Sequence, residues 1–225
     1  RPERLQTGAV KLTIHFADGD LDSDSAPDDP FFQSGLQEFL DIYQGAGLFI
    51  DDIVYRDVLT DAYETIALED EICNGGDFFT LFREAILGEP DRLHVVLVDR
   101  FQCLIAGGVD IGQTMGGLAG GIPGTLFSSQ TAHHGVAVAS QYLQDNPDRF
   151  GLVLAHEVAH FLGLFHVRER DVAGARDIFD IIQDTGEDDS AASENLMDYQ
   201  SSDGISLSLG QSEILLNHPL VYARD

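Results

Sequence analysis

The sequence is short of lysine, cysteine and tryptophan, and it has no long apolar run. Tryptophan is absent from the 225 residues, and Lys11 is the single lysine. No stretch of about 20 apolar residues occurs, so we expect no membrane-spanning helix. The two cysteines, Cys73 and Cys103, lie in no CxxC pattern, which excludes a cysteine-rich zinc module. They could form one disulfide in a secreted protein or stay as two buried thiols.

Positive charge is also scarce. Lysine and arginine total 12 against 39 acidic residues, which gives a formal net charge of −27. Such a surface repels nucleic acid and anionic lipid, so we expect neither nucleic acid nor a membrane as a partner. It suits bound calcium, cationic substrates or high salt, and it would equally keep the protein soluble.

The hydrophobic pattern predicts a mixed fold with one core. Alternating or β-branched segments predict strands at 9–17 and 48–58, and a continuous apolar centre predicts a doubly buried strand at 92–101. Helical spacing predicts helices at 31–47 and 77–87. Because the second half has little strand signal, we expect an α+β fold. It would have a mixed α/β upper lobe with a twisted sheet and a small irregular lower lobe.

Two further segments lie before the most informative motif. The glycine-rich stretch 105–127 has no phosphate-loop pattern, so we expect an irregular, edge-forming segment and no nucleotide cofactor. Residues 134–143 predict another strand. Asn146 can cap the next helix and Pro147 suits its first position.

The stretch "AHEVAHFLGLFH" places ionisable side chains on a helix that is otherwise apolar. His156 and His160 are four residues apart, so they lie on one helical face and can hold one metal ion. Glu157 points about 100° away and reaches the rim of such a site, where it can take a proton from metal-bound water. Gly163 can end the helix in a left-handed conformation and bring back His166 as third ligand. Three histidines leave a fourth position open, which is typical of catalytic zinc.

Burial supports a metal. Unpaired buried histidine and glutamate cost several kcal/mol, and a bound cation removes that cost. The alternative is three core histidines satisfied by backbone carbonyls. The apolar residues that surround the motif are Leu152, Val153, Leu154, Ala155, Val158, Ala159, Phe161 and Leu162.

"HEVAHFLGLFH" matches HExxHxxGxxH, and the chain therefore resembles the metzincin zinc endopeptidases. Metzincins have a methionine turn under the metal, and "NLMDY" offers Met197, thirty-one residues after His166. The resemblance makes Met197 a hydrophobic floor. It makes Tyr199 a group that reaches the metal or stabilises the tetrahedral intermediate, with a core tyrosine as the alternative.

Within the metzincins, the segment 184–216 is most similar to the pappalysin group. The shared features are an Asp-Thr before the turn, the Asn-x-Met-Asp-Tyr turn and a glutamine-bearing helix after it. "VRERD" after His166 fits no subgroup, and the extra cysteines of pappalysins are missing. The resemblance implies one catalytic domain, 1–225, with an upper subdomain at 1–165 and a lower one at 166–225.

The resemblance also implies a function. We expect a zinc endopeptidase in which His156, His160 and His166 bind zinc and Glu157 activates water. An upper-lobe edge strand, near 105–130, would bind an extended protein or peptide substrate. We expect a secreted monomer whose signal and any propeptide are absent from this chain. The alternatives are a zinc aminopeptidase or other amide hydrolase, and a catalytically silent, metal-stabilised binding module.

Two acidic loops are candidate structural calcium sites, with solvated acidic loops as the alternative. The first has aspartates at alternate positions and the second follows the third histidine. Their acids are Asp18, Asp20, Asp22 and Asp24, and then Asp177, Asp180, Asp184, Glu187, Asp188 and Asp189. The remaining histidines are expected to be structural or surface residues: His15, His94, His133, His134 and His218.

Overall fold

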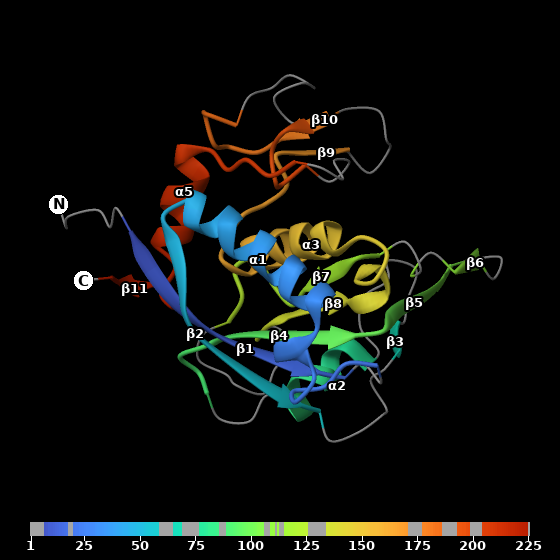
Figure 1. Cartoon of the computed structure of the whole chain (residues 1–225). Coiled ribbons are helices and arrows are strands. Elements are labelled where there is room, and N and C mark those ends of the chain that lie inside the picture. The colour runs from blue at the N-terminus through green and yellow to red at the C-terminus, as the bar shows by residue number, and fades with distance from the viewer. Residues whose placement is uncertain are drawn as a thin grey trace.

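A mostly parallel sheet forms the centre of the molecule (Figure 1). The computed structural model describes residues 7–17, 20–58, 65–68, 77–85, 89–105, 109–110, 112, 115–125, 134–170, 177–185, 193–198 and 204–224. The strands of the sheet are β1 (Gly8–Phe16), β2 (Leu48–Asp57), β4 (Leu93–Val98), β7 (Gly117–Ala119), β8 (Val136–Ala139) and β11 (Tyr222–Ala223). Their order is β11-β1-β4-β8-β7, and β2 also pairs with β1. β7 and β11 run antiparallel to their neighbours, and the other strands are parallel.

The strands predicted at 9–17, 48–58 and 92–101 are confirmed as β1, β2 and β4. Every residue of β4 is buried, as its continuous apolar run predicts, because side chains on both faces are covered. The strand predicted at 134–143 is shorter and ends in a 3-10 turn, Ser140–Tyr142. The mixed sheet confirms the predicted α/β upper lobe.

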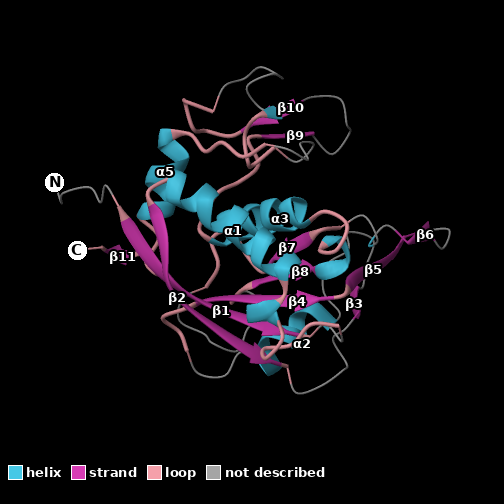
Figure 2. Cartoon of the chain, in the orientation of Figure 1, coloured by secondary structure: helices cyan, strands magenta, loops and turns pink. Residues whose placement is uncertain are grey.

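Helices cover both faces of the sheet (Figures 1 and 2). α1 (Pro30–Gly45) and α3 (Pro147–Phe161) pack on one face, and α2 (Asp77–Ala85) packs on the other. The prediction for the start of α3 is confirmed, because the Asn146 side chain accepts a hydrogen bond from Arg149 N (3.1 Å) and Pro147 is the first helical residue.

α1 and α3 lie in direct backbone contact. A methyl group on Gly151 would overlap the carbonyl oxygen of Gly35, so only glycine fits at the crossing. The Tyr43 hydroxyl donates to the Ala155 carbonyl (2.9 Å), and Tyr43 is fully buried. This contact fixes α3 one residue before His156.

Several short elements were not predicted from the sequence. β3 (Thr65–Leu68), β5 (Arg100–Ile105) and β6 (Val109–Asp110) form a second sheet beside the first. Cys103 on β5 is buried and disulfide-bonded, and Cys73 lies outside the described residues. β9 (Arg168–Arg170) and β10 (Asp177–Phe179) form a hairpin above α3 in Figure 1. By contrast, α5 (Leu209–Leu216) is the glutamine-bearing helix that was expected after the methionine turn.

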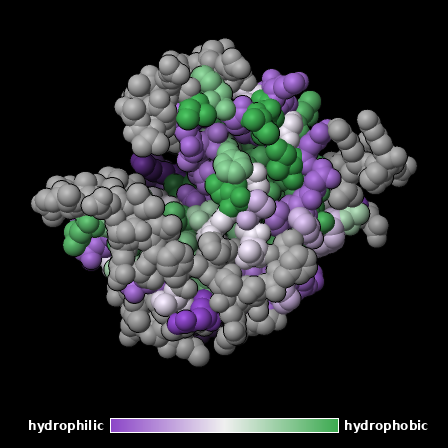
Figure 3. Space-filling model, turned by 180° about the vertical axis from the view of Figure 1, so that it is seen from behind, coloured by the Kyte–Doolittle hydropathy of each residue, from purple (hydrophilic) through white to green (hydrophobic). Residues whose placement is uncertain are grey.

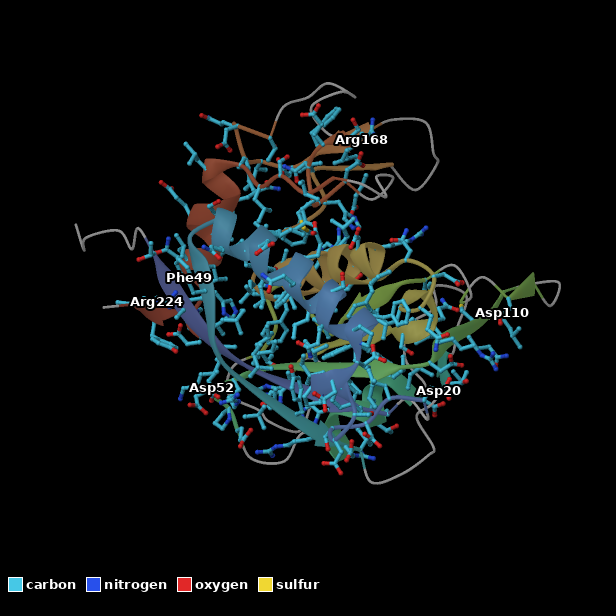
Figure 4. All side chains as sticks on the ribbon, viewed as in Figure 1. Asp20, Phe49, Asp52, Asp110, Arg168 and Arg224 are labelled. Carbon is cyan, nitrogen blue, oxygen red and sulfur yellow. The ribbon has the colours of Figure 1, made fainter. Side chains whose placement is uncertain are left out.

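The first and last strands, β1 and β11, meet on one side of the molecule (Figure 1). β11 pairs with the start of β1, and the Arg224 guanidinium lies 4.1 Å from the ring centroid of Phe49 on β2 (Figure 4). These contacts bring the segment after α5 back to the central sheet. No helix in the described ranges is long and apolar enough to cross a membrane.

Candidate metal centre and active site

The end of α3 presents the motif to a cleft. The helix ends at Phe161, and Gly163 then takes a φ of +113°, which side-chain-bearing residues rarely adopt. Its N–H bonds to the His160 carbonyl (2.9 Å), and the Leu164 N–H bonds to the Ala159 carbonyl (2.9 Å). The predicted glycine turn is confirmed, and it returns the chain toward the helix so that His166 meets the other two histidines.

The three imidazoles converge through their Nε2 atoms. His166 Nε2 lies 3.1 Å from His156 Nε2 and 3.1 Å from His160 Nε2. Among the described residues, these three form the one His/Cys/Asp/Glu group whose ligand atoms lie within 4.8 Å of one another. Zinc–nitrogen bonds of about 2.0–2.1 Å in a tetrahedral site place ligand nitrogens about 3.3 Å apart. The observed spacing therefore fits zinc.

The hydrogen bonds of the other ring nitrogens also fit a metal. His156 Nδ1 lies 2.7 Å from the Leu196 carbonyl, and His160 Nδ1 lies 2.7 Å from the Leu164 carbonyl. Carbonyls only accept, so both Nδ1 atoms carry the proton and both Nε2 lone pairs face the common centre. Burial lowers the pKa of His156 to about 4 and of His160 to about 3, which keeps both rings neutral as metal ligands require.

Glu157 lies beside this cluster in a site that favours its protonated form. Burial raises the pKa of Glu157 to about 8, and the backbone amide of Ala119 acts in the opposite direction. A methyl group on Gly117 of β7 would overlap Glu157 Cγ, so this side chain lies against the backbone of the edge strand. The cleft is lined by Gly116, Gly117, Arg149, Leu152, Val153, His156, Glu157, His166, Leu196, Asp198 and Gly204.

The predicted methionine turn lies next to the histidines. Met197 is fully buried in the main core. The preceding carbonyl, of Leu196, bonds to His156, and the Met197 carbonyl accepts from Val167 N (3.0 Å). The turn therefore contacts the chain on both sides of the cluster. Tyr199 lies outside the described residues, so its predicted role stays a prediction.

Two amides brace this turn, a role that sequence reasoning missed. Asn195 and Gln211 exchange two hydrogen bonds of 2.8 and 3.0 Å, and both are buried. Asn195 Oδ1 also accepts from Met197 N (2.9 Å), while Gln211 forms a capping box with Ser208 at the start of α5. The asparagine of the Asn-x-Met-Asp-Tyr turn and the glutamine of the following helix were visible in the sequence. Their pairing could not be predicted, because it depends on the fold.

Three charged residues near the third histidine were also missed. Glu169 Oε1 lies 2.9 Å from His166 Nδ1, and Arg168 pairs with buried Asp198 (3.3 Å). All belong to or contact the "VRERD" stretch, which matched no pattern. An acid three residues after a metal-binding histidine was the available signal.

The candidate calcium loops gather no ligand cluster among the described residues. Asp22 accepts from the Ser25 backbone and hydroxyl (2.7 and 2.6 Å), and Asp180 accepts from Thr185 Oγ1 (2.7 Å). Asp184 accepts from Ser208 and Gly210 at the start of α5. These carboxylates stabilise local turns and a helix start. Four further candidate ligands lie outside the described residues: Asp18, Glu187, Asp188 and Asp189.

The remaining histidines are structural where the structure describes them. His15, His94, His134 and His218 are all buried, and His15 Nε2 lies 3.0 Å from His94 Nδ1. His133 lies outside the described residues.

Comparison with known proteins agrees with this geometry. Residues 108–212, which include the histidine cluster and the methionine turn, match the peptidase family model described as pregnancy-associated plasma protein-A. This match, together with the three-histidine cluster, supports a zinc metallopeptidase of the metzincin type. No curated protein sequence matches this chain.

Solved structures show the same fold. Archaemetzincin from Methanopyrus kandleri aligns with a TM-score of 0.52 and 15% identity, over 93% of this chain and 95% of that chain. Metalloproteinase-II from Bacteroides fragilis aligns with a TM-score of 0.51 and 14% identity, over 96% of this chain and 54% of that chain. The predicted metzincin-like fold is confirmed.

Proposed function

We propose that this metallopeptidase is a zinc-dependent endopeptidase that cleaves extended protein or peptide substrates. The observation that carries the proposal is the convergence of three histidine Nε2 atoms beside a cleft that Glu157 also lines. A purely structural metal site needs no carboxylic acid at its rim, which counts against a silent binding module.

The metal would be held by His156, His160 and His166 through Nε2. Zinc, when bound there, supplies a Lewis acid that polarises a peptide carbonyl and makes hydroxide available at neutral pH. Met197 forms the apolar floor of the site. Tyr199 is proposed to donate a hydrogen bond to the developing oxyanion.

Glu157 moves the protons of the reaction. Its carboxylate takes a proton from the attacking water and then delivers it to the leaving amine. A cation held by the three histidines would favour the carboxylate of Glu157 over its acid form. The contact with Gly117 holds the carboxylate next to the edge strand, where a scissile peptide would lie.

β7 is the proposed docking edge for substrate. It pairs with β8 on one side, and in the described ranges it ends the sheet on the other. An extended peptide can add to such an edge through backbone hydrogen bonds, which tolerates varied side chains. The cleft would lie between an upper subdomain, 1–165, and a lower one, 166–225. We propose a secreted monomer that binds neither nucleic acid nor membrane.

Product mapping tests the endopeptidase assignment. The protein is incubated with an unfolded protein substrate and zinc, with and without a chelator, and the products are sequenced by mass spectrometry. Internal cuts that disappear with chelator support the proposal. Stepwise loss of N-terminal residues would instead show an aminopeptidase. Stoichiometric zinc without any cleavage would favour the binding module.

A further inference from the structure

The three histidines of the cluster differ in what holds them. His156 and His160 each donate Nδ1–H to a buried backbone carbonyl, of Leu196 and Leu164. His166 Nδ1 faces a side-chain carboxylate, Glu169 Oε1, at 2.9 Å. The third ring is therefore oriented by a charged group rather than by the main chain.

The backbone of Glu169 is held in place by contacts of the β9–β10 hairpin. It follows Arg168, which is buried and pairs with Asp198 (3.3 Å) at the methionine turn. Arg168 and Asp198 also form a parallel backbone bridge, and Glu169 pairs with Ile178 across the β9–β10 hairpin. Figure 4 shows Arg168, the first residue of β9, in the part of the molecule above α3. The strand therefore fixes the backbone of Glu169 even though its side chain is 56% exposed.

A carboxylate affects a metal-binding imidazole in two ways, whereas a neutral carbonyl provides only the first. It accepts the Nδ1 proton, which fixes the tautomer with the Nε2 lone pair toward the metal, and its negative charge makes the imidazole a stronger donor to a cation. His166 is also the one ligand outside α3, so its orientation depends on the loop and not on a helix. The third ligand has the greatest need for such a partner.

We propose that Glu169 is a positioning residue for the metal centre, which orients His166 and strengthens its bond to zinc. Nothing in the HExxHxxGxxH pattern includes this position. The inference rests on the zinc site of the proposed function and extends it to the "VRERD" segment. It gives that segment a role in metal retention.

Zinc affinity tests the proposal without relying on activity. Zinc dissociation constants of wild type, Glu169→Ala and Glu169→Gln are measured by competition with a chromophoric chelator. Removing an outer partner of a metal ligand weakens binding by about 10–100-fold, and we expect that loss for Glu169→Ala. Glu169→Gln keeps an accepting oxygen without the charge, so its affinity should lie between the two.

The controls separate positioning from folding and from general charge. Glu194→Gln removes an exposed carboxylate at the start of the methionine-turn segment and should bind zinc like wild type. The zinc-free forms of all variants should unfold at the same urea concentration as wild type.

Equal zinc affinity of Glu169→Ala and wild type would overturn the proposal. Equal affinity of Glu169→Gln and wild type would overturn the part that depends on charge. If wild type itself bound no zinc, the proposed function would fail instead, so the two failures are distinguishable.

Discussion

Gly163 shows how one residue places a ligand. Its φ of +113° costs any other residue backbone strain, while a Cβ there would touch only Ile214 Cγ2 at 3.4 Å and Pro123 Cβ at 3.8 Å. Gly163→Ala should therefore lower the free energy of unfolding by about 1–3 kcal/mol through strain alone. It should also weaken zinc binding, because relief of the strain moves His166.

Urea unfolding and zinc titration measure both effects. Gly45→Ala is the matched control, because a Cβ at Gly45 meets nothing within 4 Å and its φ is not positive. It should be neutral or slightly stabilising. Unchanged stability in Gly163→Ala would contradict the strain argument.

Gly117 is the second residue where a side chain cannot fit. A Cβ would overlap Glu157 Cγ, so Gly117→Ala should displace the carboxylate and leave the histidines in place. Displacing a catalytic group by about 1 Å can cost 10²-fold in rate, and we expect a loss of about that size. Peptidase assays with parallel zinc analysis test this. Full activity with normal zinc content would show that Glu157 is not held by β7.

Among the site residues, the sequence could predict those whose positions depend only on neighbouring residues in the chain. The spacing of His156 and His160 and the glycine turn before His166 follow from helical periodicity and chain reversal. Glu169 and Asp198 could not be predicted, because their partners are chosen by tertiary contacts. Tyr199 lies outside the described residues and stays a prediction.

The element that supports the methionine turn is α5. Asn195 and Gln211 join the two through reciprocal buried amide bonds. Replacing one amide leaves the NH2 group of the other buried without its acceptor, at a cost of about 1–3 kcal/mol. Asn195→Ala and Gln211→Ala should each show that loss in urea unfolding, and the double variant should lose much less than their sum. Additive losses would contradict a direct pairing.

Whole elements were predictable where their own residues define them. α3 begins at the predicted cap, and β4 begins one residue after the predicted start because its apolar run defines it. The predicted strand ran on to residue 101, whereas β4 ends at Val98 and β5 begins at Arg100. β9 and β10 have three residues each, too few for a periodic pattern, and they exist because they pair with each other.

Some large apolar side chains lie on the molecular surface. Seen from behind, hydrophobic and hydrophilic side chains lie side by side over the upper middle of the molecule (Figure 3). Large apolar side chains that are more than half exposed include Leu104, Phe165, Ile178, Ile181, Ile205 and Leu209. Exposure of this kind is ordinary for scattered apolar residues.

The whole molecule should lose stability in acid through its buried histidines, and two of them lie on the central sheet. Burial, with a contribution from His94, lowers the pKa of His15 to about 3, and burial lowers the pKa of His94 to about 4. Below pH 6.5 the unfolded chain binds protons that the folded chain does not, so the free energy of unfolding falls as the pH drops. The expected slope is about 1.4 kcal/mol per pH unit for each histidine, down to the folded pKa values.

Urea unfolding between pH 8 and pH 4 tests this. His15→Gln should reduce the slope by about 1.4 kcal/mol per pH unit, because one of the buried histidines no longer titrates. A slope equal to that of wild type would contradict the assignment.

The central claim is that Glu157 acts as the base of a zinc peptidase. The most direct test is cleavage of an unfolded protein by wild type and Glu157→Gln side by side, with the zinc content of each measured. We predict that Glu157→Gln keeps its zinc and loses nearly all cleavage, because an amide cannot accept the proton. Equal cleavage by both proteins would contradict the mechanism.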